Sequence, residues 1–146
     1  MRKFVALLMA ITLAACGSES LELSALENSP ILQAEIPGFS GGRATERTAG
    51  SITKLFDVAG SWEDASVALA KAVKAHGWLV ESINCVGTGN DVIARRQING
   101  TWVLLESGAG AGGAGMILSI GSNPGSPSSL EVTGSCPQAL IEAAGS

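Results

Sequence analysis

The sequence predicts an α+β domain in which one long helix packs on an antiparallel sheet of about four to five strands, with a short C-terminal helix. One central segment, residues 61–77, has apolar residues at helical spacing between a capping residue and a glycine. The segments after it alternate with a period near two and are separated by turn residues. Helices that are separate in sequence from a run of hairpin-linked strands favour a two-layer domain.

The start of the chain has the composition of a removable leader. Arg2 and Lys3 precede an apolar run over residues 4–15. Twelve residues rise about 18 Å as a helix, well short of the roughly 30 Å hydrocarbon core of a bilayer. The run therefore suits the apolar region of a secretory leader better than a membrane span. An ordinary buried N-terminal helix, or a leader that is cut elsewhere, are the alternatives.

Leu13-Ala14-Ala15-Cys16 resembles the lipobox of a bacterial lipoprotein signal peptide. The resemblance covers the first 16 residues and implies a signal peptide over residues 1–15, cleavage before Cys16, and a diacylglycerol in thioether linkage on that sulfur. It further implies a membrane-anchored protein of the cell envelope that faces the periplasm or the exterior. Gly17, in place of the Asp of the Gram-negative sorting pattern, implies the outer membrane if the organism has one.

Residues 16–50 are predicted to be the lipidated cysteine and a flexible linker. Their Gly and Pro residues, at Pro37-Gly38, Ser40-Gly41-Gly42 and Gly50, are dense enough to interrupt regular structure. Leu26 and Ile31 favour no more than a short apolar helix. The folded α+β domain is accordingly expected over residues 51–146.

The domain begins with a first strand or an extended lead-in at residues 52–58. The helix follows this segment. Ser61 is its expected N-cap, Asp64 three residues later is placed to make the reciprocal capping contact, and Gly77 ends the helix. Its apolar stripe consists of Trp62, Ala65, Leu69, Ala72, Val73 and His76.

Five strands are expected after this helix, at residues 78–86, 92–98, 101–107, 116–120 and 130–133. Asn99-Gly100, between the second and the third, is a strong two-residue hairpin signal. Pro137 then opens a short helix over residues 138–144, because proline is tolerated in a first turn.

Three cysteines are present, and the leader accounts for one of them. If Cys16 carries lipid, Cys85 and Cys136 remain as a pair in an oxidising compartment, where a disulfide is the natural expectation. Two buried thiols are the alternative. Two cysteines and the single, distant His76 fall short of the four ligands of a structural zinc site.

The charge pattern excludes nucleic acid as a partner. The chain carries a net charge of −4, and the mature part would be more acidic because Arg2 and Lys3 leave with the leader. A nucleic-acid surface needs clustered cations. Here only Arg95 and Arg96 are adjacent in the expected domain, and neighbours on a strand point to opposite faces.

A run of glycine and alanine, residues 108–115, fits the G-x-G-x-x-G pattern of dinucleotide sites. Such a site also requires a helix that opens on the last glycine, whereas the β-rich residues 116–120 follow here. We therefore interpret the run as a flexible hairpin loop and expect no cofactor.

Catalytic arrangements are weakly supported. His76 with Asp57 or Asp91 and a serine would be needed for acyl transfer, but no nucleophile motif accompanies them. Glu81, Glu106 and Glu131 lie on three predicted strands and could share a face. A glycosidase pair would need two carboxylates held about 5–9 Å apart in a cleft, and solvent-facing positions explain these residues better. We therefore expect that the protein is not an enzyme.

The sequence favours a protein- or cell-wall-interaction module that is anchored to the membrane through Cys16 and binds an envelope protein or peptidoglycan through an exposed sheet edge or its tail. A carrier of a small amphiphile, held between the helix and the sheet, is the alternative. An envelope enzyme is a third and less favoured hypothesis.

Overall fold

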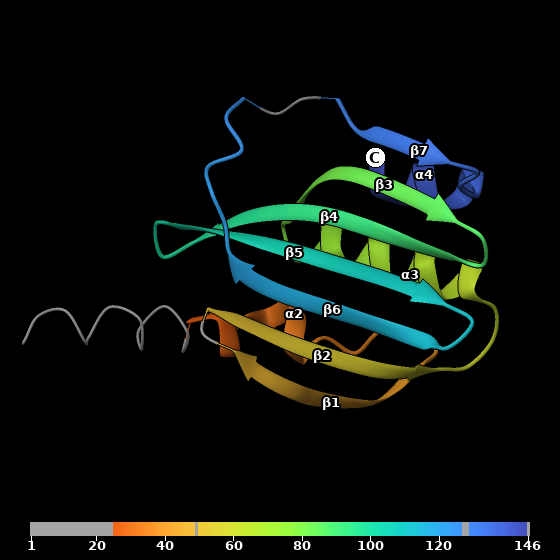
Figure 1. Cartoon of the computed structure of the whole chain (residues 1–146), viewed down its shortest axis with the longest axis horizontal. Coiled ribbons are helices and arrows are strands. Elements are labelled where there is room, and N and C mark those ends of the chain that lie inside the picture. The colour runs from red at the N-terminus through yellow and green to blue at the C-terminus, as the bar shows by residue number, and fades with distance from the viewer. Residues whose placement is uncertain (1–24, 49, 127–128, 146) are drawn as a thin grey trace, which may run out of the picture.

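The computed structural model describes residues 25–48, 50–126 and 129–145. Seven strands of this part form one sheet, and the helices lie behind it in the view of Figure 1. The elements in chain order are α2 (Pro30–Gln33), β1 (Phe39–Thr48), β2 (Ser51–Val58), α3 (Trp62–Ala75), β3 (Leu79–Val86), β4 (Gly89–Ile98), β5 (Thr101–Gly110), β6 (Gly113–Ile120), β7 (Glu131–Gly134) and α4 (Gln138–Gly145).

The sheet has the strand order β1-β2-β6-β5-β4-β3-β7. Its neighbouring strands are antiparallel except β3 and β7, which run parallel. The predicted fold class, one long helix on an antiparallel sheet of four to five strands, is therefore wrong. The described chain is mostly sheet, seven-stranded and mixed, and its longest helix has 14 residues. β7 is parallel because the chain crosses β5, β4 and β3 after β6 instead of returning through a hairpin.

The sheet also has more strands than predicted because the segment before Ser51, which we expected to be a linker, contributes a strand. Its residues 25–48 belong to the folded domain, and β1 pairs with β2 from Phe39 to Thr48. The core includes Leu26, Ile31, Leu32 and Ile36, each exposed by 5% or less. Gly38 and Gly50 misled us because they serve the turns on either side of β1, with φ values of 83° and 81°.

The predicted leader, residues 1–15, and the predicted lipid acceptor Cys16 lie outside the described residues.

Helix α3 forms where the sequence predicts it. The Ser61 side chain accepts a hydrogen bond from the backbone N–H of Asp64 at 3.1 Å, and Gly77 follows the helix with a φ of 78°. The helix buries Leu69 and Val73 completely against the sheet. Full burial of a side chain of this size contributes about 1.5–3 kcal/mol.

The sequence predicts the hairpin between β4 and β5 better than the hairpin between β5 and β6. Asn99 and Gly100 take φ values of 49° and 83°, as a tight two-residue turn between β4 and β5 requires. The glycine and alanine run is not the flexible loop that we expected. It forms the end of β5 and the start of β6, which pair up to Gly110 and Gly113.

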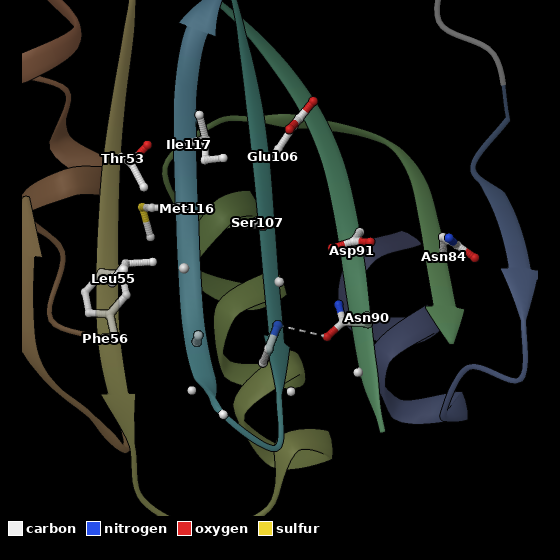
Figure 2. A pocket seen from close by; sticks show the side chains of 18 of the residues that line it. Thr53, Leu55, Phe56, Asn84, Asn90, Asp91, Glu106, Ser107, Met116 and Ile117 are labelled. Atoms are coloured by element: carbon white, nitrogen blue, oxygen red, sulfur yellow. Dashed lines mark hydrogen bonds between the residues drawn. The ribbon is translucent and has the colours of Figure 1, made fainter. Parts of the chain in front are cut away.

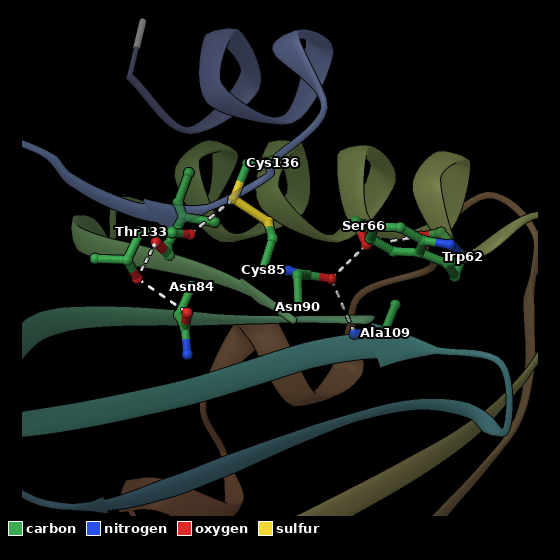
Figure 3. The surroundings of a disulfide bond; sticks show 9 residues. Trp62, Ser66, Asn84, Cys85, Asn90, Ala109, Thr133 and Cys136 are labelled. Carbon is green, nitrogen blue, oxygen red and sulfur yellow. Dashed lines mark hydrogen bonds between the residues drawn. A yellow bond between two sulfur atoms is a disulfide. The ribbon is translucent and has the colours of Figure 1, made fainter. Parts of the chain in front are cut away.

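The predicted disulfide between Cys85 and Cys136 is present, with Cα atoms 5.2 Å apart. It joins the end of β3 to the segment between β7 and α4 (Figure 3). Thr133 Oγ1 adds a hydrogen bond of 2.9 Å to Asn84 Oδ1 beside it. The bridge therefore fastens the last strand and helix to the rest of the sheet.

Candidate functional site

The two faces of the sheet have different environments. The inner face, which carries Val103, Leu105 and Leu118, is buried under α3, α4 and the residues before β1. The other face, which we call the outer face, has no helix of the described chain over it and is turned toward the viewer in Figure 1. Strand alternation assigns the exposed residues Leu55, Glu106 and Ile117 to this face.

Part of the outer face has no side chains. Five glycines on three neighbouring strands share this face: Gly89 on β4, Gly108 and Gly110 on β5, Gly113 and Gly115 on β6. They are cross-strand neighbours, since Gly108 pairs with Gly115 and Gly110 pairs with both Gly89 and Gly113. Because glycine has no side chain, the sheet is hollow here and forms a trough of about 690 Å³, open to solvent (Figure 2). We call this hollow the glycine trough.

Apolar and polar side chains stand around the glycine trough. Leu55 on β2 and Asp91 on β4 lie in one cross-strand row, with Gly115 and Gly108 between them. Figure 2 shows Leu55 and Ile117 on one side of the hollow and Asp91 and Asn84 on the other. Three apolar side chains of the rim are well exposed: Val86 by 72%, Leu55 by 48% and Ile117 by 38%. A hollow flanked by exposed apolar groups is typical of a binding surface.

The trough is acidic. Its lining includes Asp57, Asp91 and Glu106 and contains no Lys or Arg. Within the described ranges, none of these three carboxylates forms an ion pair or a hydrogen bond. Arg95, a cation of the same face, is already paired with Glu81 through two Nε contacts of 3.0 Å.

The three carboxylates are spread along the trough instead of converging. In the part of the chain that the structure describes, no group of three or more His, Cys, Asp or Glu side chains is placed to hold a metal ion. The three carboxylates therefore make the whole hollow electrostatically negative and do not form one cation-binding point.

Some of these glycines are required by the fold, and others are not. A Cβ at Gly108 would lie closer than 3.0 Å to the carbonyl oxygen of Asn90, and Gly113 has a φ of 130°. Gly110, by contrast, would place a Cβ in ordinary contact at 3.4 Å from Thr88 O, and Gly112 would meet nothing within 4 Å. Backbone packing thus explains the glycines at 108 and 113 but not the one at 110 on the trough floor.

A polar cluster lies beneath the floor, on the inner face. Ser66 of α3 hydrogen-bonds Asn90 and the carbonyl of Trp62, and Asn90 Oδ1 also accepts from the N–H of Ala109 at 3.3 Å (Figure 3). These contacts tie α3 to β4 and β5 directly below the glycines. They favour a rigid floor.

A second hollow, of about 620 Å³, lies between residues 33–42 and β2. Lys54 reaches into this region, donates a hydrogen bond to the carbonyl of Leu32 and lies 5.1 Å above the ring of Phe56. A lysine on the last carbonyls of a short helix is a structural contact. We therefore assign this hollow no binding role.

The other residues that the sequence singled out are scattered. His76 follows α3, and its Nδ1 lies 2.8 Å from the carbonyl oxygen of Ala72, which accepts the hydrogen bond. Asp57 and Asp91 face outward on β2 and β4. Of the three strand carboxylates, Glu106 alone lines the trough.

Comparison of the chain with protein families, with curated protein sequences and with solved structures finds no match. Within residues 25–48, 50–126 and 129–145, no helix has the length and apolarity to cross a membrane.

Proposed function

We propose that this chain is a lipid-anchored protein of the bacterial cell envelope that binds another envelope component, a protein or peptidoglycan, on the outer face of its sheet. The observation that supports this function is the glycine trough, a hollow of about 690 Å³ on the face that no described helix covers. The lipobox-like Leu13-Ala14-Ala15-Cys16 supports the anchor, which would hold this face within reach of other envelope components.

The outer face suits a partner better than either sheet edge. The register of β1 against β2 is irregular at two places, and such irregularities discourage the addition of another strand. β7, at the opposite edge, has only four residues, and its far end is fastened by the disulfide of Cys136. The outer face, by contrast, offers a continuous surface across five strands, from β2 to β3.

A carrier of an amphiphile would need space between the helix and the sheet. Leu69, Ala70 and Val73 of α3 are fully buried there, and they pack in one cluster with Val92 and Leu105 of the sheet. Side chains therefore occupy the layer in which the ligand of such a carrier would lie, and this supports the interaction module over the carrier.

We also propose a non-catalytic role. His76, the single histidine of the chain, lies at the end of α3, on the inner side of the sheet. Asp57 and Asp91, its candidate partners in catalysis, face outward. This separation argues against Asp57 or Asp91 as the carboxylate that would orient the imidazole in a catalytic triad.

The anchor is tested by following the full chain and its Cys16→Ala variant in bacterial cells that are fed a clickable fatty acid. We expect the wild-type chain to carry the label and to sediment with membranes, and the variant to lose both properties. An unlabelled wild-type chain in the soluble fraction would show that the anchor is wrong.

The binding face is tested with a photo-crosslinking amino acid at Leu55, beside the trough, or at Lys71, which is exposed on α3. In intact cells we expect a discrete crosslinked species from position 55 and none from position 71. Equal crosslinking from both positions, or none from position 55, would contradict the proposal.

A further inference from the structure

We infer that the occupant of the glycine trough is an extended segment of another protein that carries Lys or Arg side chains together with small apolar ones. This inference rests on the proposed function, since it names the chemistry of the partner at the same face. It is carried by the shape of the trough, by its charge, and by the side chains that surround it.

The shape suits a polypeptide in extended conformation. The trough spans β2, β6, β5, β4 and β3, which is about 19 Å at the usual spacing between strands. Five to six extended residues cover about this distance, at roughly 3.3 Å each. Because Gly108, Gly110 and Gly113 present no side chains, the main chain of such a segment can approach the floor of the trough closely, whereas the Leu55 side chain lies against Gly115.

The floor offers little for a ligand that depends on hydrogen bonds. The backbone groups of β5 pair with those of β4 and β6 through the whole glycine region, down to Gly89, Gly110 and Gly113. Contact with the floor is therefore mainly van der Waals contact. Leu55, Ile117 and Val86 add apolar contacts at the rim, which suits small apolar side chains of the partner.

The negative charge of the trough favours a positively charged partner. Asp57, Asp91 and Glu106 surround the trough without a cation in its lining and without an ion pair among the described residues. A segment with Lys or Arg at alternate positions would bring its cations to these carboxylates. Anionic headgroups and nucleic acid would be repelled.

The same charges disfavour a second copy of this chain as the occupant. Two copies related by a two-fold axis would meet through the same patch, so that the acids of one trough would face those of the other. Like charges brought together at an interface oppose association. The field therefore favours a partner of opposite charge.

The test measures binding of fluorescent eight-residue peptides to the full chain, purified in neutral detergent, by fluorescence anisotropy. One peptide alternates Lys with Val and Thr; the matched peptides carry Gln or Glu in place of every Lys. We expect the Lys peptide to bind, the Gln peptide to bind at least tenfold more weakly, and the Glu peptide not to bind. Equal binding of the Lys and Gln peptides would overturn the inference.

Two variants locate the binding site on the protein. The triple variant Asp57→Asn, Asp91→Asn and Glu106→Gln should weaken the Lys peptide about 10- to 30-fold, at roughly threefold for each exposed carboxylate. Its control is Glu35→Gln, Glu63→Gln and Glu142→Gln, which changes the net charge equally on residues outside the trough lining and should change binding less than twofold. Equal losses from the two triple variants would mean a non-specific polycation effect and would overturn the inference.

The shape is tested separately from the charge. Gly110→Val places a side chain on the trough floor at a position where a Cβ makes only ordinary contact, so the fold should persist. We expect it to weaken the Lys peptide at least tenfold, while Ser119→Val on β6, outside the lining, leaves binding within twofold. Unchanged binding by the Gly110 variant, or equal competition by spermine at the same charge concentration, would overturn the inference.

The failure of this inference can be distinguished from the failure of the proposed function. If crosslinks from position 55 persist in cells carrying the triple variant Asp57→Asn, Asp91→Asn and Glu106→Gln, the outer face binds a partner that is not basic, and only the inference fails. If the wild-type chain gives no crosslink from position 55, the proposed function itself fails.

Discussion

Removal of the disulfide should destabilise the protein by an amount that follows from its place in the chain. Cys85 and Cys136 are separated by 51 residues. Closing a loop of this length lowers the entropy of the unfolded chain enough to stabilise the fold by roughly 4 kcal/mol. Cys85 is 6% exposed, so Cys85→Ala also loses part of a buried side chain, whereas Cys136 is half-buried. We therefore expect Cys85→Ala/Cys136→Ala to lose about 3–5 kcal/mol.

The assay is equilibrium unfolding in urea of the full chain with intact and with removed disulfide. A loss of this size lowers the midpoint by about 2 M, given a slope of roughly 2 kcal/mol per molar urea for a small domain. As a control, reductant should lower the midpoint of the wild-type chain and leave that of the double variant unchanged. A midpoint that falls by less than about 0.3 M in the double variant would refute the reasoning.

Three further predictions concern the fold and the trough floor. Ile31→Ala should lower the free energy of unfolding, measured in urea, by about 2–5 kcal/mol, because Ile31 is fully buried. A loss below about 0.5 kcal/mol would mean that this segment is a linker and not part of the core. Ser61→Ala should lower the free energy of unfolding by about 1 kcal/mol, measured by thermal unfolding, because it removes the helix cap. A neutral effect would show that this hydrogen bond does not stabilise the helix. Gly108→Ala should cost about 1–3 kcal/mol, since its Cβ would press on Asn90 O, while Gly110→Ala stays within about 0.5 kcal/mol; equal urea midpoints would contradict this difference.

Signals that act within a few residues made the elements predictable. Ser61 and Gly77 mark the ends of α3 because a cap and a left-handed glycine act on adjacent backbone groups. Asn99-Gly100 marks its hairpin for the same reason. The disulfide was predictable from a count, because assigning Cys16 to the predicted leader and lipid anchor leaves two cysteines over.

Signals that depend on distant partners were missed. Ile31 and Leu32 are apolar, but their burial depends on the sheet that α2 meets, and the surrounding Gly and Pro residues suggested a linker. β7 pairs in parallel with β3 through a crossover that no local pattern announces.

The glycine trough depends partly on local signals and partly on distant partners. Gly108 and Gly110 alternate with the buried Ala109, and Gly113 and Gly115 alternate with the buried Ala114. This period of two is a strand signal that was present in the sequence. The register that places the glycines of β5 beside those of β6 follows from the turn between them, so part of the hollow could have been predicted.

Occupation of the outer face in the envelope is the central claim, and labelling of introduced cysteines tests it most directly. Leu55→Cys beside the trough and Lys71→Cys on α3 are labelled with an impermeant maleimide, once in isolated membranes and once as purified protein. We expect position 55 to react at least fivefold more slowly in membranes than in the purified protein, and position 71 to react at the same rate in both. Equal rates at position 55 in the two preparations would contradict the account.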